Sequence, residues 1–390
     1  MAIEGRSDSG KGGRIRLGMV GGGEGAFIGT VHRIASRLDD HYELVAGALS
    51  STPDKARRSG EALGLAADRI YDDYESMAEA EAKRSGGIEA VAIVTPNHMH
   101  AGPTYAFLKA GVHVICDKPL TVSLAEAKKM QAAVEKHGRI FALTHNYTGY
   151  PLVRRMREMV MGGELGRIRL VQVEYPQDWL TGPTEETGNK QAEWRVDPRR
   201  SGAGGALGDI GTHAFNLADY VTGLELAELA ADLTSFGPGR QLDDNAQIML
   251  RYSNGARGAL WASQVAPGNE NGLMLRVYGT KGGMHWRQDN PNYLTWSPFE
   301  KSARIITRGG PDSGEAAARV TRVPPGHPEG YLEGFANIYS EVAAAIRAAR
   351  NGKKPPKGVH FPTIDDGVKG LAFVEAAVKS SKGKGKWVKL

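Results

Sequence analysis

Apolar residues in the first third of the chain gather in short continuous runs that alternate with amphipathic stretches. The runs are rich in Val, Ile and Ala and lie at 14–21, 42–50, 88–96, 112–119 and 139–146. Runs without polar alternation are typical of strands buried on both faces, and the stretches between them have helical spacing. Strands that alternate with helices predict right-handed crossovers and therefore a doubly wound parallel sheet, an α/β domain.

The pattern changes after about residue 150. We expect a helix at 151–162, a strand at 167–177, a long polar loop as far as Gly205, a second helix at 206–221, strands between 229 and 309, and helices at 331–350 and 363–380. The stretches "YSNGAR" and "GTKGG" join strands by turns, without helices between them. This second part therefore predicts an α+β domain with a large open, mostly antiparallel sheet.

These patterns divide the chain into segments. Residues 14–146 form the first domain, 147–360 the second, and 361–390 a C-terminal helix and tail that we expect to pack back on the first domain. A chain of 390 residues exceeds what one core usually fills, which agrees with two domains. Residues 1–13 are polar, contain "IEGR" and resemble a protease-linker remnant, so they are left out of the fold prediction.

Composition narrows the class of protein. With 41% hydrophobic residues, 24% charged residues and a net charge of +5, the chain is that of an ordinary soluble protein without a nucleic-acid-binding arm. The single cysteine, Cys116, excludes an internal disulfide and suits a reducing cytoplasm. No apolar run approaches the ~20 residues of a membrane helix. We expect a cytoplasmic protein that contacts neither membranes nor nucleic acid.

A glycine-rich segment, "GGGEGAFIGTVH", follows the first strand and opens a helix. Glycines allow a tight turn and close approach to phosphates, and the helix N-terminus supplies N–H groups, so this context predicts a Rossmann domain that binds NAD or NADP. Gly21 and Gly23 match the first two glycines of the G-x-G-x-x-G fingerprint, whereas Ala26 stands at the third. We expect the cofactor to contact Gly21, Gly23, Gly25, Phe27 and Ile28.

The end of the second strand bears on the choice between NAD and NADP. NAD sites usually place a carboxylate here, but this chain has Ser50 and Ser51, followed by Lys55, Arg57 and Arg58. Hydroxyls beside basic residues favour a 2′-phosphate, so we expect Ser50, Ser51 and Lys55 to bind the cofactor and slightly favour NADP. Asp54, further along, could reach the ribose of the cofactor, so NAD stays an alternative.

Lys118 follows the fourth strand in the triplet Asp117-Lys118-Pro119. Ligands of open α/β sheets bind beyond the carboxyl edge, and the proline holds the residues before it extended. This position predicts Lys118 as a catalytic and cofactor-contacting residue, with Asp117 beside the cofactor. The preceding strand ends in the same way, and from it we expect cofactor contacts by Thr95, Pro96, Asn97 and His100.

The helix at 206–221 combines an apolar face with a polar stripe. Leu207, Ile210, Ala214, Leu217 and Val221 share the apolar face, whereas Asp209, His213 and Asn216 flank it. Near a cofactor site, Asp209 and His213 are better explained as catalytic and substrate-binding residues than as structural ones. A metal site is disfavoured because no third and fourth ligand lie nearby in the sequence.

Taken together, these features resemble the glucose–fructose oxidoreductase / inositol dehydrogenase / rhizopine catabolism family (Gfo/Idh/MocA). The likeness extends over nearly the whole chain and is carried by the glycine loop, "TPNHMHA", "CDKPL", "EWRVDPRRSGAGGALGDIGTHAFNLADYV" and "PTIDDGVKGLAFVEAAVKSS". It implies an NAD(P)-dependent oxidoreductase that transfers a hydride between the cofactor and a secondary hydroxyl or ketone of a sugar, sugar derivative or inositol. In the family's Glu-Lys-Pro motif this chain has Asp117 in place of Glu.

The resemblance also implies roles for single residues. Lys118, Asp209 and His213 match the family's catalytic positions, and Trp194 and Arg195 match a Trp-Arg pair that lies near the nicotinamide. In oxidation His213 suits the base and Lys118 would stabilise the alkoxide. His145, Asn146, Tyr175 and Gln177 lie near strand ends and are candidate polyol contacts. The family commonly covers its second sheet with another subunit, so a homodimer or homotetramer through that sheet is expected.

Two other functions remain open from sequence. The first is an NAD-dependent glycoside hydrolase that oxidises a ring hydroxyl transiently. The second is a non-catalytic regulator that senses the cofactor, which Lys118, Asp209 and His213 argue against.

Overall fold

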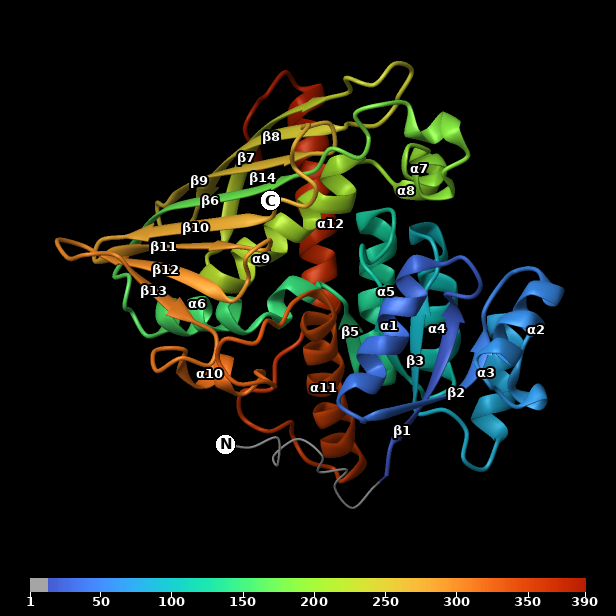
Figure 1. The fold of residues 1–390 in the computed structure, drawn as a ribbon. Helices are drawn as coiled ribbons and strands as arrows, with labels where there is room; N and C mark the ends of the chain where they lie inside the picture. Colours follow the sequence, from blue (N-terminus) through green and yellow to red (C-terminus); the bar gives the residue numbers. More distant parts are fainter. Residues whose placement is uncertain (1–12) are drawn as a thin grey trace. The chain divides into compact units, whose positions relative to one another are not determined.

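The computed structural model describes residues 13–390, which fall into two compact units (Figure 1). The first unit comprises residues up to Thr121, Ala125–Gly149 and Tyr331–Val368, and the second comprises Val122–Leu124, Tyr150–Gly330 and Lys369–Leu390. The linker-like segment expected at 1–13 lies, apart from Gly13, outside the described residues.

The first unit is built on a five-stranded parallel sheet of order β2-β1-β3-β4-β5, which confirms the predicted doubly wound α/β domain. Its strands are β1 (Ile15–Gly21), β2 (Tyr42–Ala48), β3 (Ala90–Val94), β4 (His113–Cys116) and β5 (Phe141–Leu143). Its helices are α1 (Phe27–Leu38), α2 (Pro53–Ala62), α3 (Tyr74–Lys83), α4 (Ala101–Lys109), α5 (Leu124–His137) and α11 (Tyr331–Arg350), with short turns η2 (Ala67–Arg69), η3 (Asn97–Met99) and η4 (Asn146–Gly149).

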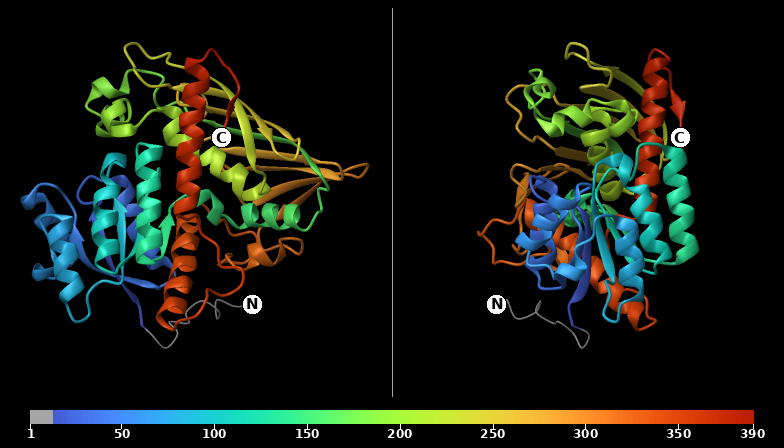
Figure 2. Two further views of the ribbon diagram at one scale, coloured as in Figure 1. Left: turned by 180° about the vertical axis from the view of Figure 1, so that it is seen from behind. Right: turned by 90° about the vertical axis from the view of Figure 1, so that its right-hand side faces the viewer.

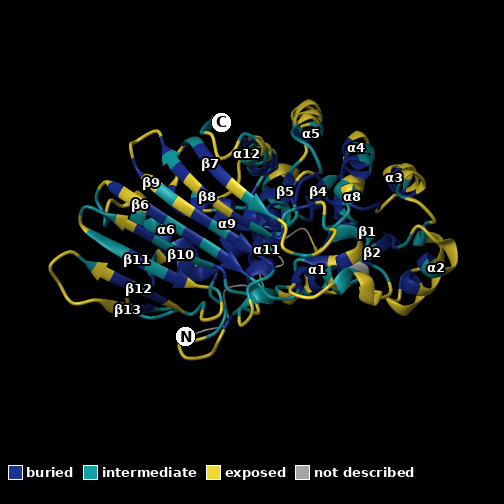
Figure 3. Ribbon diagram, turned by 90° about the horizontal axis from the view of Figure 1, so that it is seen from above, coloured by how far each residue is buried: buried dark blue, intermediate teal, exposed yellow. Residues whose placement is uncertain are grey.

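Helices cover both faces of this sheet: α1 and α11 lie on one face, and α3, α4 and α5 on the other (Figure 3). Every residue of β3 is therefore buried, which explains the continuous apolar runs in the sequence. Because the strands are parallel, the segments that follow β1, β3, β4 and β5 leave the sheet at one edge, where α/β proteins bind ligands.

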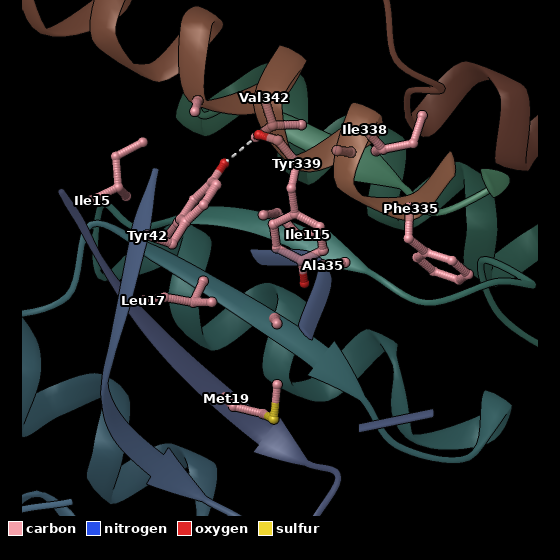
Figure 4. Close-up of a cluster of buried hydrophobic side chains, with 14 of the residues drawn as sticks. Ile15, Leu17, Met19, Ala35, Tyr42, Ile115, Phe335, Ile338, Tyr339 and Val342 are labelled. Atoms are coloured by element: carbon pink, nitrogen blue, oxygen red, sulfur yellow. Dashed lines mark hydrogen bonds between the residues drawn. The ribbon is translucent and has the colours of Figure 1, made fainter. Parts of the chain in front are cut away.

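Helix α11 completes the core of the first unit (Figure 4). Its apolar face, with Phe335, Ile338 and Val342, packs over residues of β1 and α1 in one buried cluster. Tyr42 of β2 donates a hydrogen bond of 2.9 Å to the backbone oxygen of Tyr339. The burial of this face accounts for why α11, which the sequence pattern placed in the second domain, belongs to the first unit.

The second unit contains a nine-stranded sheet of order β13-β12-β11-β10-β6-β9-β8-β7-β14, in which only β6 and β9 pair in parallel. The strands are β6 (Ile168–Pro176), β7 (Leu226–Thr234), β8 (Asn245–Tyr252), β9 (Arg257–Ser263), β10 (Met274–Gly279), β11 (Gly282–Arg287), β12 (Tyr293–Pro298), β13 (Arg304–Thr307) and β14 (Val388–Lys389). This arrangement confirms the expected large, mostly antiparallel sheet.

One face of the nine-stranded sheet packs against α6 (Pro151–Met161) and α9 (Thr212–Thr222). Along β8 buried residues alternate with more exposed ones, as expected of a sheet with one covered face (Figure 3). Helix α12 (Ile364–Lys382) is continuous (Figure 2). Its Phe373 stacks on Phe215 of α9, and Ser380 accepts a hydrogen bond from the backbone N–H of Ala231 in β7.

The end of the chain differs from the prediction. Residues 361–390 were expected to pack on the first domain; residues up to Val368 do belong to the first unit, whereas Lys369–Leu390 belong to the second. The physical reason is the pairing of β14 with β7, together with the stacking of Phe373 on α9. Strand β14 is too short to give a periodic signal in the sequence.

The segment between β6 and α9 is more structured than a polar loop. It contains the short helices η5 (Thr184–Thr187), α7 (Lys190–Arg195) and α8 (Pro198–Ser201). A further short helix, α10 (Gly314–Ala318), follows β13. The helix expected at 206–221 is present, but it begins with a π-helical turn, η6 (Leu207–Gly211), that periodicity did not predict. Its five expected core residues, Leu207 to Val221, are buried.

Candidate active site

The glycine loop after β1 forms a cradle that only glycine allows. Gly21 and Gly22 have positive φ angles of 77° and 72°. A Cβ atom on Gly29 would lie 2.4 Å from the Cα of Gly22, so α1 and the loop can approach this closely only without side chains. Gly29 thus packs where the third fingerprint glycine usually does, whereas the regular spacing of the fingerprint falls on Ala26.

The other loop residues border the same cradle. Gly23 packs against the backbone oxygen of Leu49, to which its N–H donates at 3.1 Å, and Gly25 has a φ of 77°. Phe27 and Ile28 open α1, whose first turn has N–H groups without intrahelical partners. A cradle of this shape at a helix N-terminus fits the pyrophosphate of a dinucleotide, and these residues would hold it.

The basic residues after β2 lie beside carboxylates. An Nη of Arg57 lies 3.3 Å from Asp54 and another 3.9 Å from Glu61, while Arg58 lies 3.4 Å from Glu24 of the glycine loop. Ser50 accepts a hydrogen bond of 3.2 Å from the N–H of Thr52, Ser51 is exposed and Lys55 is half-buried. The positive charge seen in the sequence is therefore balanced locally.

The end of β3 lies next to the cradle. A Cβ on Gly21 would meet the methyl group of Thr95 at 2.9 Å, which places Thr95 and Pro96 beside the loop. His100 is fully buried, and its two ring nitrogens lie 2.9 Å from the backbone oxygen of Thr95 and 2.8 Å from that of Pro119. Its ring ties the ends of β3 and β4 together, so it acts on the site through these backbone groups. Asn97 is buried in η3.

Asp117 and Lys118 follow β4 at the same edge of the sheet. Asp117 accepts a hydrogen bond of 2.9 Å from Thr144, and Nε2 of His32 lies 3.7 Å from the same carboxylate oxygen. Burial alone would raise the pKa of Asp117, but His32, Lys118 and His100 outweigh it and lower the pKa to about 2. Lys118 is half-buried and its bond to Pro119 is cis. These contacts fix the side chain of Asp117 and thereby the backbone directly before Lys118.

His145 and Asn146 follow β5 and are buried in the same unit. Burial, and then the charge of Lys118, lower the pKa of His145 to about 3, so its imidazole is neutral. Within the described chain, Nδ2 of Asn146 is a buried donor without a hydrogen-bond partner. An unsatisfied buried donor at the carboxyl edge of the sheet is what a bound ligand would satisfy.

In the second unit the carboxylate of Asp209 is held by two side chains. Nε of Arg195 donates to Oδ2 of Asp209 at 3.2 Å, and Nε2 of Gln264 donates to the same oxygen at 2.9 Å. The guanidinium of Arg195 also lies over the rings of Trp194, at 4.4 Å, and Trp179, at 5.9 Å. Arg195 and Asp209, which the sequence pointed out separately, thus form one cluster.

His213 lies one turn after Asp209, at the start of α9. The π turn places one more residue in the turn that carries Asp209 than a regular helix would, and π turns are frequent at functional sites. The ring of His213 is mostly buried and meets Tyr175 of β6 edge to face at 6.2 Å. Tyr175 and Asp209 therefore flank His213 within this unit.

A network of amides and aromatic rings continues from Tyr175. The hydroxyl of Tyr175 and Nε2 of Gln177 both donate to Oδ1 of Asn271, at 2.7 and 2.8 Å. Nε1 of Trp179 donates to Gln177 at 3.0 Å. Neutral donors and acceptors beside aromatic surfaces suit a ligand rich in hydroxyl groups.

Several functional residues were missed from the sequence. They share a position that only the fold reveals. Each packs against the glycine loop, contacts a predicted site residue, or holds the backbone at the start of the helix that carries Asp209: Gly29, His32, Ser59, Thr144, Trp179, Asp243, Gln264 and Asn271. For Gln264 the sequence holds a weak signal, a polar residue just after a buried strand, but nothing there indicates that Asp209 is its partner.

Within residues 13–390, no three His, Cys, Asp or Glu side chains gather as they would around a metal ion. In the same described part of the chain, no helix is both long enough and apolar enough to cross a membrane.

Comparison with known proteins agrees with this geometry. A family model described as "Oxidoreductase family, NAD-binding Rossmann fold" matches residues 15–145, and "GFO/IDH/MocA C-terminal domain" matches residues 153–285. The "Uncharacterized oxidoreductase YfiI" of Bacillus subtilis is 35% identical, with 96% of each chain covered. The chain belongs to the Gfo/Idh/MocA oxidoreductase family.

Solved structures add detail. An oxidoreductase from Sinorhizobium meliloti is 59% identical with a TM-score of 0.88, covering 96% of this chain and 99% of that one. An inositol dehydrogenase homolog from Azotobacter vinelandii, complexed with NADH and myo-inositol, is 35% identical with a TM-score of 0.90, covering 97% and 98%. The protein is an oxidoreductase with an NAD-binding Rossmann domain, as the sequence predicted.

Proposed function

We propose that the protein is an NAD-dependent dehydrogenase that oxidises a secondary hydroxyl of an uncharged sugar or cyclitol, or reduces the corresponding ketone. The observation that carries the proposal is the carboxyl edge of the five-stranded parallel sheet, where the glycine cradle follows β1 and Lys118 follows β4. The similar inositol dehydrogenase homolog with bound NADH and myo-inositol supports the same substrate class.

We assign steps of the reaction to residues of both units. The glycine loop would hold NAD, and the bound cofactor would supply the acceptor for the hydride of the carbinol carbon. His213 takes the hydroxyl proton, because imidazole readily exchanges a proton near neutral pH. The ammonium group of Lys118 stabilises the negative charge that develops on the oxygen. Asp209 accepts hydrogen bonds from substrate hydroxyls, and Arg195 and Gln264 fix its orientation.

The groups around Asp209 favour an uncharged substrate. The charge of Arg195 faces the carboxylate of Asp209, and the further polar side chains are the neutral Gln177, Gln264 and Asn271. A sugar phosphate or sugar acid would need a cation that is not already paired. Trp179, which is half-buried, offers a flat surface on which the C–H face of a sugar ring packs. His145 and Asn146 remain proposed polyol contacts.

The cofactor that we propose is NAD rather than NADP. The sequence showed Lys55, Arg57 and Arg58 after β2, but Glu24, Asp54 and Glu61 bring an equal number of negative charges. A 2′-phosphate gains affinity from net positive charge, which this segment does not have.

Activity measurements test the proposal. Purified protein with NAD⁺ and a panel of inositols, aldoses and 1,6-anhydro sugars should produce NADH, with lower kcat/KM for NADP⁺ and for phosphorylated sugars. Release of an aglycone from glycosides without net NADH would support the transient-oxidation mechanism instead. No reaction in either direction, while NADH binds, would support a cofactor-sensing role.

Two substitutions test the residue roles. Lys118→Met and His213→Ala should each lower kcat by about 10²- to 10⁴-fold, the range for groups that stabilise charge or transfer a proton, while the dissociation constant of NADH changes little. The exposed Lys136→Met on α5 serves as the control for charge. Unchanged turnover in either test variant would remove that residue from the mechanism.

We also propose a homodimer or homotetramer formed through the face of the nine-stranded sheet opposite α6 and α9. That face is hollowed by a pocket of ≈ 550 Å³ whose lining includes Met249, Trp261 and Gln247. Met249 is 57% exposed, which is unusual for a large apolar side chain in the middle of a sheet.

Light scattering measures the mass of the assembly and should give a lower mass for Met249→Glu than for wild type. Phe299→Glu, on an exposed turn after β12, should leave the mass unchanged. A monomeric wild type would contradict the proposal.

A further inference from the structure

Asp243, just before β8, holds the backbone at the start of the helix that carries Asp209 and His213. Its Oδ1 accepts a hydrogen bond from the N–H of Gly205 and its Oδ2 one from Leu207, both at 2.8 Å. Its backbone oxygen accepts a third, from Ala206, also at 2.8 Å. One residue thus holds three consecutive N–H groups at the start of the π turn.

The contact between Asp243 and Gly205 is tight. A Cβ on Gly205 would lie 2.1 Å from the backbone oxygen of Asp243, so any other residue at position 205 would force the two segments apart. The backbone oxygen of Gly205 in turn accepts the N–H of Asp209 at 2.9 Å. A continuous hydrogen-bonded path therefore runs from Asp243 through Gly205 to Asp209.

The next residue, Asp244, reaches Asp209 by a second route. Its backbone oxygen accepts the N–H of Gln264 at 2.8 Å, and the side chain of Gln264 donates to Asp209. The carboxylate of Asp244 is fixed by Arg240 at 3.0 Å. The dipeptide Asp243-Asp244 consequently sets both the backbone of Asp209 and the amide that orients its carboxylate.

We propose that Asp243 is a positioning residue for the dehydrogenase reaction, which sets the place of Asp209 by fixing Gly205–Leu207 against β8. This inference rests on the proposed function and assigns no substrate contact to Asp243. Burial raises the pKa of Asp243 to about 6, although the N–H groups of Leu207 and Gly205 lower it. The carboxylate form has an acceptor for each of the two N–H groups, whereas an amide has one acceptor and one donor.

The alternative is that Asp243 only stabilises the helix start, as many capping residues do. The two roles differ in their coupling to Asp209. A residue that acts through Asp209 loses its effect on the reaction when Asp209 is already replaced, whereas a general stabiliser has the same effect in either background.

A double-mutant cycle tests this with Asp243→Asn, Asp209→Asn and the combination. Asp243→Asn alone should lower kcat/KM for the polyol by about tenfold or more, and in the Asp209→Asn background by about twofold or less. The KM for NAD should stay within about twofold in every variant. The exposed Asp312→Asn, in the same unit, is the matched control. Equal effects in the two backgrounds would overturn the proposal.

Hydrogen exchange provides a readout that does not need a substrate. In Asp243→Asn, amides of residues 205–213 should exchange faster than in wild type, and those of β3 and β4 should not change. Gly205→Ala disrupts the same contact from the other side and should give the same local pattern. If wild type turned over no polyol, the proposed function would fail, while this result would still test whether Asp243 holds residues 205–213 in place. Exchange that rises equally across the chain, or not at all, would overturn it.

Discussion

Nε of Arg195 donates a hydrogen bond of 3.2 Å to Oδ2 of Asp209, a carboxylate oxygen that also accepts one from Gln264. Arg195 lies at the end of the short helix α7, 14 residues before Asp209. The arginine therefore fixes the segment between β6 and α9 to the carboxylate, and it compensates the negative charge of a residue that we assign to substrate binding.

Replacing Arg195 by Met should lower kcat/KM for the polyol by about 10- to 100-fold, because a hydrogen bond to a charged group contributes about 1.5–3 kcal/mol. Steady-state kinetics with a saturating cofactor measures this. Arg199→Met is the control from the neighbouring helix, since Arg199 is exposed and pairs only locally, with Asp197. A loss of the same size in both variants would argue against a specific role for Arg195.

Gly29 is predicted to be essential for cofactor binding. In Gly29→Ala the new Cβ would meet Gly22 at 2.4 Å, so the loop and α1 must separate and the pyrophosphate cradle opens. NADH titration, followed by fluorescence, should show an affinity at least about tenfold weaker, as for a displaced phosphate contact. Gly370→Ala in α12 meets no atom within 4 Å and should leave NADH binding unchanged. Wild-type affinity in Gly29→Ala would refute this account of the cradle.

Apart from β14, the sequence predicted where strands occur in both sheets because their signals are local. Continuous apolar runs identified β1 to β5, and the turn residues near 253 and 281 identified two hairpins of the second sheet. Glycine content and strand ends likewise pointed to the loop after β1 and to Lys118. Each of these inferences needs only neighbouring residues.

The features that the sequence alone did not reveal depend on contacts between distant residues. The glycine that packs against Gly22 is three residues beyond the expected position, since the fingerprint assumes a shorter loop. Helix α11 joined the first unit because its apolar face packs on β1, more than 300 positions earlier, and periodicity does not name a partner. The charges after β2 were counted without Glu24, which the fold brings to Arg58. Asp209 lies in a π-helical turn instead of a regular α-helical turn. Sequence periodicity assumes regular helices or strands, so it does not predict such a turn.

Asp117 is predicted to stabilise the protein above about pH 4 and to lose this effect in acid. Its pKa in the folded protein is about 2, below the ordinary value of 3.8. The carboxylate therefore favours the folded state once it is ionised in the unfolded chain, and this contribution disappears as the pH falls through about 2. The depression corresponds to about 2 kcal/mol at neutral pH.

Urea unfolding of wild type and Asp117→Asn from pH 2.5 to 7 measures this contribution. The difference in unfolding free energy should be largest near pH 7 and should shrink below pH 4. Asparagine can still accept the hydrogen bond from Thr144, so the variant isolates the charge. Asp72→Asn, on an exposed turn, is the control. A difference that does not vary with pH would show that the charge of Asp117 adds nothing to stability.

Glu24 is predicted to help the protein select NAD over NADP. Its carboxylate lies 3.4 Å from Arg58, and its backbone N–H donates to Ser59 at 3.1 Å, so the glycine loop places a negative charge beside an arginine in the middle of α2. Glu24→Gln keeps the backbone contact and removes the charge. Arg58 is then available to a 2′-phosphate, and kcat/KM for NADP⁺ should rise by about two- to fivefold, the scale of an exposed ion pair, with NAD⁺ unchanged. The gain should shrink at 0.5 M salt, because exposed charges are screened.

Glu79→Gln on α3 makes the same change of charge at an exposed position away from the loop and should alter kcat/KM for neither cofactor. If Glu24→Gln raised activity with both cofactors equally, the carboxylate would act on the loop as a whole and not on the choice between them.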